Sequence, residues 1–258
     1  MRTIQSLYRY PVKGLSPEPL QAVLLQVGQG IPRDRELALT NGRWQYDPLH
    51  YAPRPKTDFL MLMQHESLAA LRTRVSEDGL RLMVQAPDGS SLDVALSSPD
   101  DQDRTSEFFA KYLGGRLEGS PRLVKAGTHR FTDVSVVSPT LMQSVSIINL
   151  ASVRDLGERM GCTLDPMRFR ANVYYEGGEP WEELAWIDRE LRLGEVPARA
   201  VLRTRRCAAT NVNPVTGARN LGIPQALIKN FRHGDVGIYV ELLGGGTLRP
   251  GDTLDTPT

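Results

Sequence analysis

The run Arg203-Thr204-Arg205-Arg206-Cys207 is the strongest chemical signal in the chain, because three arginines lie within four residues of one cysteine. Nearby cations stabilise a thiolate, and a thiolate is a nucleophile or a soft metal ligand. The turn-forming run Asn213-Pro214-Val215-Thr216-Gly217 follows, which places Cys207 at a strand end or in a loop. The alternative is a buried, inert cysteine beside surface arginines, because free cysteines are commonly buried.

Three further segments carry basic residues in settings that suit an anionic ligand. They are Arg168-Phe169-Arg170-Ala171-Asn172, Tyr10-Pro11-Val12-Lys13-Gly14 and Arg33-Asp34-Arg35. Arginine suits bidentate phosphate recognition, and a glycine after lysine lets the backbone approach a ligand closely. Each segment also has an ordinary structural reading: a solvated strand entry, a turn, or an alternating ion-pair strand.

Other chemistries find little support in the sequence. The four histidines are scattered without metal-ligand spacing, and the nucleophile elbow, dinucleotide fingerprint and phosphate loop are absent. Two cysteines, Cys162 and Cys207, cannot hold a four-cysteine iron–sulfur cluster, so the sequence has no recognisable electron-delivery module. A formal net charge of +1 argues against a nucleic-acid binder.

The elements that must position these residues are mostly short strands. Strand-like runs begin at Ile4, Val23 and Leu37, and Asn41-Gly42 predicts a hairpin from 37–40 to 43–46. A second hairpin is predicted from 80–84 to 92–95. Helices are expected over 66–75, 105–113 and 150–160, the last with Asn149 as its N-cap and Gly161 as its C-cap.

Strand signals return after residue 171, at 172–175, 191–193, 200–202, 237–242 and 251–254. The pattern indicates an α+β, β-rich fold, a barrel or sandwich with few helices. The Ser-, Asp- and Pro-rich stretch 97–102 suggests a junction between domains at 1–95 and 96–258. We find neither an apolar signal region nor a stretch of about 20 apolar residues, so we expect a soluble, cytoplasmic protein without membrane partners.

Taken together, these segments resemble the MOSC family, named for the C-terminal domain of molybdenum cofactor sulfurase. The resemblance rests on the N-terminal lysine and arginine motifs, on Ser146-Ile147-Ile148-Asn149, and on Arg168 to Asn172. It also rests on Arg206-Cys207 with Thr210, Pro214, Thr216 and Gly217, and on Arg249-Pro250-Gly251-Asp252. It implies a MOSC β-barrel core and a smaller N-terminal β-barrel-like domain that packs against it.

The resemblance also implies a site for molybdenum cofactor (Mo-molybdopterin). Cys207 would be the thiolate on the metal, and Lys13, Arg35 and Arg170 would hold the phosphate and the pterin edge. Asn172 would add a polar contact, Arg205 stands where relatives place a small polar residue, and the Gln143-Ser144 turn would line the metal pocket through its backbone. Gly14 replaces a serine, Ala171 a proline and Asn213 an aspartate of the amidoxime-reducing members, departures that bear on the substrate. Cys162 is interpreted as structural.

Two classes of function follow from this interpretation. The first is an oxidoreductase that reduces N-hydroxylated or N-oxide small molecules, with electrons from a separate ferredoxin-like or flavin reductase partner. The second is a non-catalytic carrier or sulfur-transfer module for the cofactor. An enzyme should retain the cofactor and turn over with an artificial electron donor, whereas a carrier should release it to an acceptor protein.

Overall fold

The computed structural model describes residues 1–258 except 48, 51, 116, 118, 257 and 258. An eight-stranded sheet has the order β15-β11-β12-β13-β9-β10-β1-β2 and carries most of the C-terminal half. Its strands are β1 (Thr3–Arg9), β2 (Glu18–Leu20), β9 (Val145–Asn149), β10 (Val173–Glu176), β11 (Glu190–Leu193), β12 (Val196–Arg205), β13 (Asp235–Leu242) and β15 (Leu254–Asp255). The chain's first strands therefore belong to the same sheet as its last ones.

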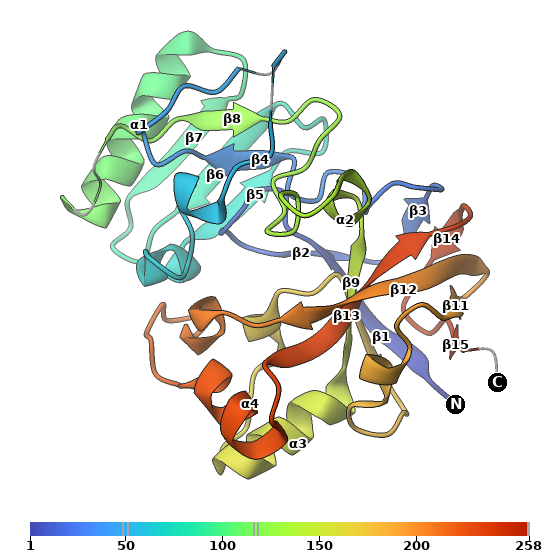
Figure 1. The fold of residues 1–258 in the computed structure, drawn as a ribbon. Helices are drawn as coiled ribbons and strands as arrows, with labels where there is room; N and C mark the ends of the chain where they lie inside the picture. The colour runs from blue at the N-terminus through green and yellow to red at the C-terminus, as the bar shows by residue number, and fades with distance from the viewer. Residues whose placement is uncertain (48, 51, 116, 118, 257–258) are drawn as a thin grey trace.

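Smaller sheets make up the N-terminal half. They pair β5 (Arg72–Val75), β6 (Arg81–Gln85) and β7 (Ser91–Ala95), then β4 (Leu37–Leu39) with β8 (Leu123–Lys125), and β3 (Val23–Leu25) with β14 (Gly246–Leu248). Figure 1 shows β4 to β8 gathered with α1 (Pro99–Leu113) at the upper left, apart from the large sheet. Helix α1 packs on β7 and β8, so the stretch 97–102 leads directly into this helix.

Helices cover one face of the large sheet, because its strands alternate between two apolar clusters. Ile147 packs in the apolar cluster that the strands themselves form on one face of the sheet. Its neighbour Ile148 points to the other face and packs in the cluster beneath α3 (Leu150–Met160) and α4 (Ile223–Phe231). Figure 1 shows α3 and α4 together at the bottom. The remaining helical turns are α2 (Pro139–Met142), η1 (Lys56–Asp58), η2 (Glu66–Ala70), η3 (Pro166–Phe169), η4 (Glu182–Ala185) and η5 (Ala208–Asn211).

The β-rich fold with few helices is confirmed. Helix α3 has the predicted caps: the Asn149 side chain accepts the Ala151 N–H, and Gly161 adopts a left-handed φ of 68°. The second predicted hairpin is also present, as β6 and β7. The large sheet is not closed by a continuous ladder in the described residues, where an isolated bridge between Thr3 and Thr253 joins β1 to the chain before β15.

Two local predictions were wrong, and in both cases long-range pairing decides. The segment 66–75 is not one helix, because η2 ends at Ala70 and β5 then pairs with β6. The Asn41-Gly42 hairpin does not form, because β4 pairs with the distant β8. Residues 43–46 are not a strand; instead Trp44 packs against Phe59, with 5.6 Å between ring centroids.

Candidate functional site

A cavity of about 440 Å³ lies where the end of β12, the turn after β1 and η3 come together. Seven lysine, arginine and polar residues predicted from the sequence line it together with Cys207: Lys13, Gly14, Arg35, Ser144, Arg170, Asn172 and Arg205. These residues are separated by up to 194 positions in the chain, from Lys13 to Cys207. Folding therefore gathers separate weak motifs into one site.

Cys207 opens onto this cavity rather than into a closed apolar core. It follows the last residues of β12, begins η5 and is half-buried. Its backbone carbonyl accepts the Thr210 N–H at 3.1 Å and the Thr210 hydroxyl at 2.9 Å. These bonds fix the turn that presents the sulfur, and Cys207 is half-buried rather than buried as in the alternative interpretation.

Lys56 lies beside Cys207 and was not predicted from the sequence. Burial alone would lower the pKa of its ammonium group, but Asp133 and a hydrogen bond with Cys207 raise that pKa overall. The Lys56 Nζ lies 3.8 Å from the Asp133 carboxylate. A protonated amine is therefore held next to the sulfur at neutral pH.

Lys13 and Asp133 form one wall of the cavity. The Lys13 ammonium makes an ion pair with Asp133 and donates to the Phe131 carbonyl at 3.0 Å. Burial lowers the pKa of Lys13. Partial burial disfavours the charged Asp133 carboxylate, but Lys13 and Lys56 outweigh it and lower the pKa of Asp133 to about 2.

Gly14 follows Lys13 with a φ of 80°, which a residue with a side chain rarely adopts. A Cβ there would lie 3.0 Å from the Leu60 carbonyl oxygen. The backbone next to Lys13 therefore has little space for a residue larger than glycine, unless the Leu60 segment shifts.

Arg35 and Arg170 both lie against the buried ring of Tyr10, with guanidinium-to-centroid distances of 4.6 and 4.3 Å. Arg35 is tied down by an ion pair with Asp34 and by a hydrogen bond to the Arg170 carbonyl at 2.9 Å. The Arg170 guanidinium makes neither an ion pair nor a hydrogen bond with any residue that the structure describes. Burial lowers the pKa of Arg170, yet an arginine stays charged, so this half-buried cation lacks a counterion.

Asn172 and Ser144 line the cavity, but protein partners occupy their side chains. The Asn172 carbonyl oxygen accepts from the Ser146 N–H and hydroxyl, and its amide donates to the Tyr8 carbonyl at 3.2 Å. The Ser144 hydroxyl donates to the Leu141 carbonyl at 2.7 Å. Asn172 therefore joins β9 to β1, and its predicted contact with a cofactor stays a prediction.

Gln143 does not line the cavity, unlike the serine that follows it. Its side-chain amide donates to the Thr128 carbonyl at 2.9 Å, and its oxygen accepts the Gly30 N–H at 3.4 Å. Gln143 thus connects two loops, and a direct role for its side chain in the site has no geometric support.

The three arginines before Cys207 divide into two kinds. Arg203 donates to the Leu184 carbonyl, and Arg206 donates to the Val236 and Phe169 carbonyls, so both brace the backbone. Arg205 is exposed at the cavity mouth. Thr204, which lies between Arg203 and Arg205 in the sequence, also lines the cavity. Its buried hydroxyl has no hydrogen-bond partner among the described residues.

The cavity is strongly electropositive. Asp133 is the one acidic residue among its described lining residues, against the cations Lys13, Arg35, Lys56, Arg168, Arg170, Arg203, Arg205 and Arg206. The described residues hold no group of three or more His, Cys, Asp or Glu side chains that could bind a metal by themselves. The positive lining suits an anionic ligand.

Comparisons with known proteins agree with this geometry. The MOSC domain matches residues 122–255, and the MOSC N-terminal beta barrel domain matches residues 1–122. The chain belongs to the MOSC family. The family profiles meet at residue 122, after α1, and the division at residue 95 stays a prediction.

Relatives span nearly the whole chain. Human mitochondrial amidoxime reducing component 2 is 32% identical and human mitochondrial amidoxime-reducing component 1 is 23% identical, each over 98% of this chain and 82% of its own length. Molybdenum cofactor sulfurase of Drosophila grimshawi is 28% identical over 91% of this chain and 31% of its own length. This MOSC chain has no helix long and apolar enough to cross a membrane in its described part.

Sequence reasoning missed three notable residues of this MOSC site: Lys56, Asp133 and Tyr239. Lys56 begins the short turn η1 and Asp133 lies in another turn, and neither segment is long enough for residue spacing to give a signal. Tyr239 had one, because it is a polar-tipped residue within the apolar strand β13, where burial raises the pKa of its phenol.

Proposed function

We propose that this MOSC protein binds molybdenum cofactor and reduces N-hydroxylated or N-oxide compounds with electrons from a separate partner. The observation that carries the proposal is the convergence of Cys207 and the uncompensated Arg170 cation on one electropositive cavity. A soft thiolate suits molybdenum, and a charged cavity suits the phosphate of the pterin. The names of the amidoxime-reducing relatives support the choice of substrate class.

The lining residues fit such a cofactor. The Thr204 hydroxyl is buried without a partner among the described residues, and leaving a buried polar group unpaired is costly. The Arg170 guanidinium lacks a counterion in the same part of the chain. Lys13, Arg35 and Arg170 would hold the phosphate and pterin edge, Arg205 would lie at the mouth, and Cys207 would be the protein ligand to the metal.

When bound, the cofactor supplies a two-electron redox centre. Reduction of an N-hydroxylated compound consumes two electrons and two protons, breaks the N–O bond and releases water. The protonated Lys56 Nζ lies beside Cys207, where its positive charge would favour the thiolate that the metal needs. Asp133 holds Lys13 and Lys56 in place, so the cations are positioned before a ligand arrives.

Electrons must come from another protein under this proposal. Two cysteines are too few for a four-cysteine iron–sulfur cluster, so the chain lacks a recognisable module for electron delivery. The relatives are themselves named as components, which is consistent with a ferredoxin-like or flavin reductase donor.

The decisive experiment is metal and pterin analysis of the chain made in a host that synthesises molybdenum cofactor. The parent should carry close to one molybdenum per chain, and Cys207→Ser should lose at least nine-tenths of the metal or of the activity. Activity would be measured as benzamidoxime reduction with chemically reduced viologen dye. Cys162→Ser is the matched control, because Cys162 packs against the apolar cluster under α3, and it should retain both. Equal molybdenum and equal activity in the parent and Cys207→Ser would refute the proposal.

The second candidate is a carrier or sulfur-transfer module for the same cofactor. The observation favouring it is the match to molybdenum cofactor sulfurase, of which this chain covers 31%. Incubation of the loaded chain with a cofactor-free molybdenum enzyme separates the two. Activation of the acceptor, with no benzamidoxime turnover by the chain itself, would support the carrier and overturn the reductase.

A further inference from the structure

A second cavity, of about 640 Å³, lies next to the cofactor pocket and has no part in the chemistry described above. Its walls come from both halves of the chain: η2, β5 and the β6–β7 turn on one side, η3 and the segment after η5 on the other. The two cavities share Leu62, Arg168, Arg170 and Ala209, so a thin partition of side chains separates them. The volume falls in the range of small-molecule sites.

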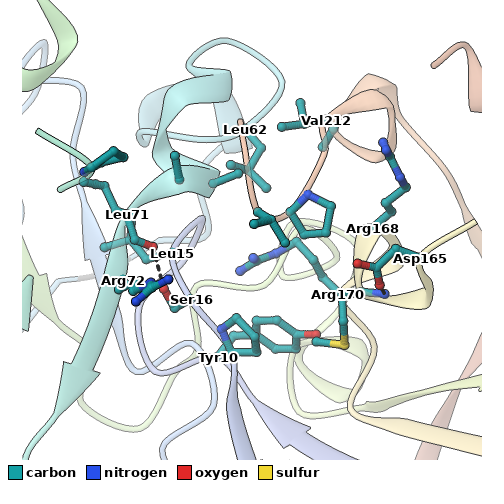
Figure 2. A pocket seen from close by; sticks show the side chains of 18 of the residues that line it. Tyr10, Leu15, Ser16, Leu62, Leu71, Arg72, Asp165, Arg168, Arg170 and Val212 are labelled. Atoms are coloured by element: carbon teal, nitrogen blue, oxygen red, sulfur yellow. Dashed lines mark hydrogen bonds between the residues drawn. The ribbon is translucent and has the colours of Figure 1, made fainter. Parts of the chain in front are cut away.

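Hydrocarbon lines most of the second cavity. Figure 2 shows Tyr10 at the bottom of the view, Leu62 and Val212 at the top, and Leu71 at the left. Alanine, proline and valine side chains complete the apolar walls. The polar groups on the walls include the Gln85 amide, the Tyr10 hydroxyl and three arginines; the Ser16 hydroxyl already donates to the Leu71 carbonyl at 2.8 Å. An occupant therefore needs an apolar body more than hydrogen-bonding edges.

The charges on the walls are predominantly positive. The Arg168 guanidinium donates hydrogen bonds to the Asn211 backbone carbonyl and to the Asn220 side-chain carbonyl. The guanidinium groups of Arg72 and Arg170 line the cavity without an ion pair or hydrogen bond to the residues that the structure describes; the Arg170 group stacks on the Tyr10 ring, and Figure 2 shows Arg72 to the left of Tyr10. The one acid, Asp165, accepts the Met167 N–H at 2.8 Å.

From this lining we infer that the second cavity binds a small organic anion with a hydrocarbon body, such as a medium-chain or aryl carboxylate. Its carboxylate lies by Arg72, since Arg170 is assigned to the cofactor, and its chain or ring packs on the apolar walls. A nucleotide is a poorer occupant, because its base would bury several polar edges where the walls offer few partners. Since Arg170 also lines the cofactor pocket, its side chain alone would separate the ligand from the cofactor at that point.

The test is displacement of 8-anilinonaphthalene-1-sulfonate from the full chain, purified from a cofactor-synthesising host. Decanoate, decan-1-ol and cytidine monophosphate are the competitors. Decanoate should compete at least about tenfold more tightly than decan-1-ol, because a charged hydrogen bond is worth about a tenfold change in affinity or more. It should also compete more tightly than cytidine monophosphate, whose base would bury polar edges against apolar walls. Equal competition by decan-1-ol, or tighter competition by cytidine monophosphate, would overturn the inference.

Three variants locate the binding. Arg72→Gln should weaken decanoate at least about tenfold, whereas Arg74→Gln should change it less than twofold. Both arginines are exposed on β5, but Arg74 lies outside the cavity. Ala70→Trp fills the cavity and should also abolish binding, with circular dichroism as the check on folding. The exposed Arg72→Gln variant keeps the test decisive if Ala70→Trp fails to fold, and unchanged decanoate affinity in Arg72→Gln refutes the site.

Discussion

Removing the carboxylate that holds Lys13 tests how the cofactor pocket is preorganised. In Asp133→Asn, the buried Lys13 ammonium keeps only the Phe131 carbonyl, and its ion pair is lost. The drop in the pKa of Asp133 from 3.8 to about 2 corresponds to roughly 2.5 kcal/mol of folding free energy. Because 49% of the Asp133 side chain is exposed, solvent screening reduces the expected loss to about 1 kcal/mol.

The stabilisation by Asp133 should depend on pH in a definite direction. Asp133 has a depressed pKa in the folded state, so its contribution is complete above pH 3.8 and disappears as the pH falls through about 2. Urea unfolding of the parent and Asp133→Asn should differ by about 1 kcal/mol between pH 5 and 7. That difference should shrink steadily towards pH 2.

Asp93→Asn is the matched control, because Asp93 pairs with Arg81 on the surface, where the two side chains are 58% and 49% exposed. This variant should change the unfolding free energy by less than about 0.5 kcal/mol. If Asp133→Asn behaves like Asp93→Asn, or if its loss does not vary with pH, then the ion pair does not preorganise Lys13.

Two further predictions follow from single side chains. Arg170→Ala should lower cofactor retention at least about tenfold, since it removes a cation whose guanidinium makes neither an ion pair nor a hydrogen bond with the described residues; molybdenum content after dialysis measures this, with exposed Arg189→Ala unchanged. Glu183 is fully buried, and burial raises its pKa from 4.5 to about 7. The unfolding free energy of the parent should therefore fall by up to about 3 kcal/mol relative to that of Glu183→Gln as pH rises from 4.5 to 8. Urea unfolding measures both free energies, and a difference between them that stays constant across this pH range would contradict the prediction.

Local sequence determined the elements whose signals lie within a few residues. Helix α3 begins and ends where Asn149 and Gly161 predict, because capping is a short-range interaction. The hairpin of β6 and β7 follows from its turn for the same reason. Helix α4 was missed, because its apolar stripe is short and its packing on α3 is a long-range contact.

The chemical parts of the site were also visible in the sequence, whereas their arrangement was not. Cys207 and the basic motifs could be named from residue types, but only folding shows that Arg170 faces the cavity unpaired. In contrast, Arg203 and Arg206 donate to backbone carbonyls. Lys56 carries no sequence signal and still reaches Cys207. Residue type fixes what a group can do, whereas its partners and its burial, which decide what it does here, depend on contacts between distant segments.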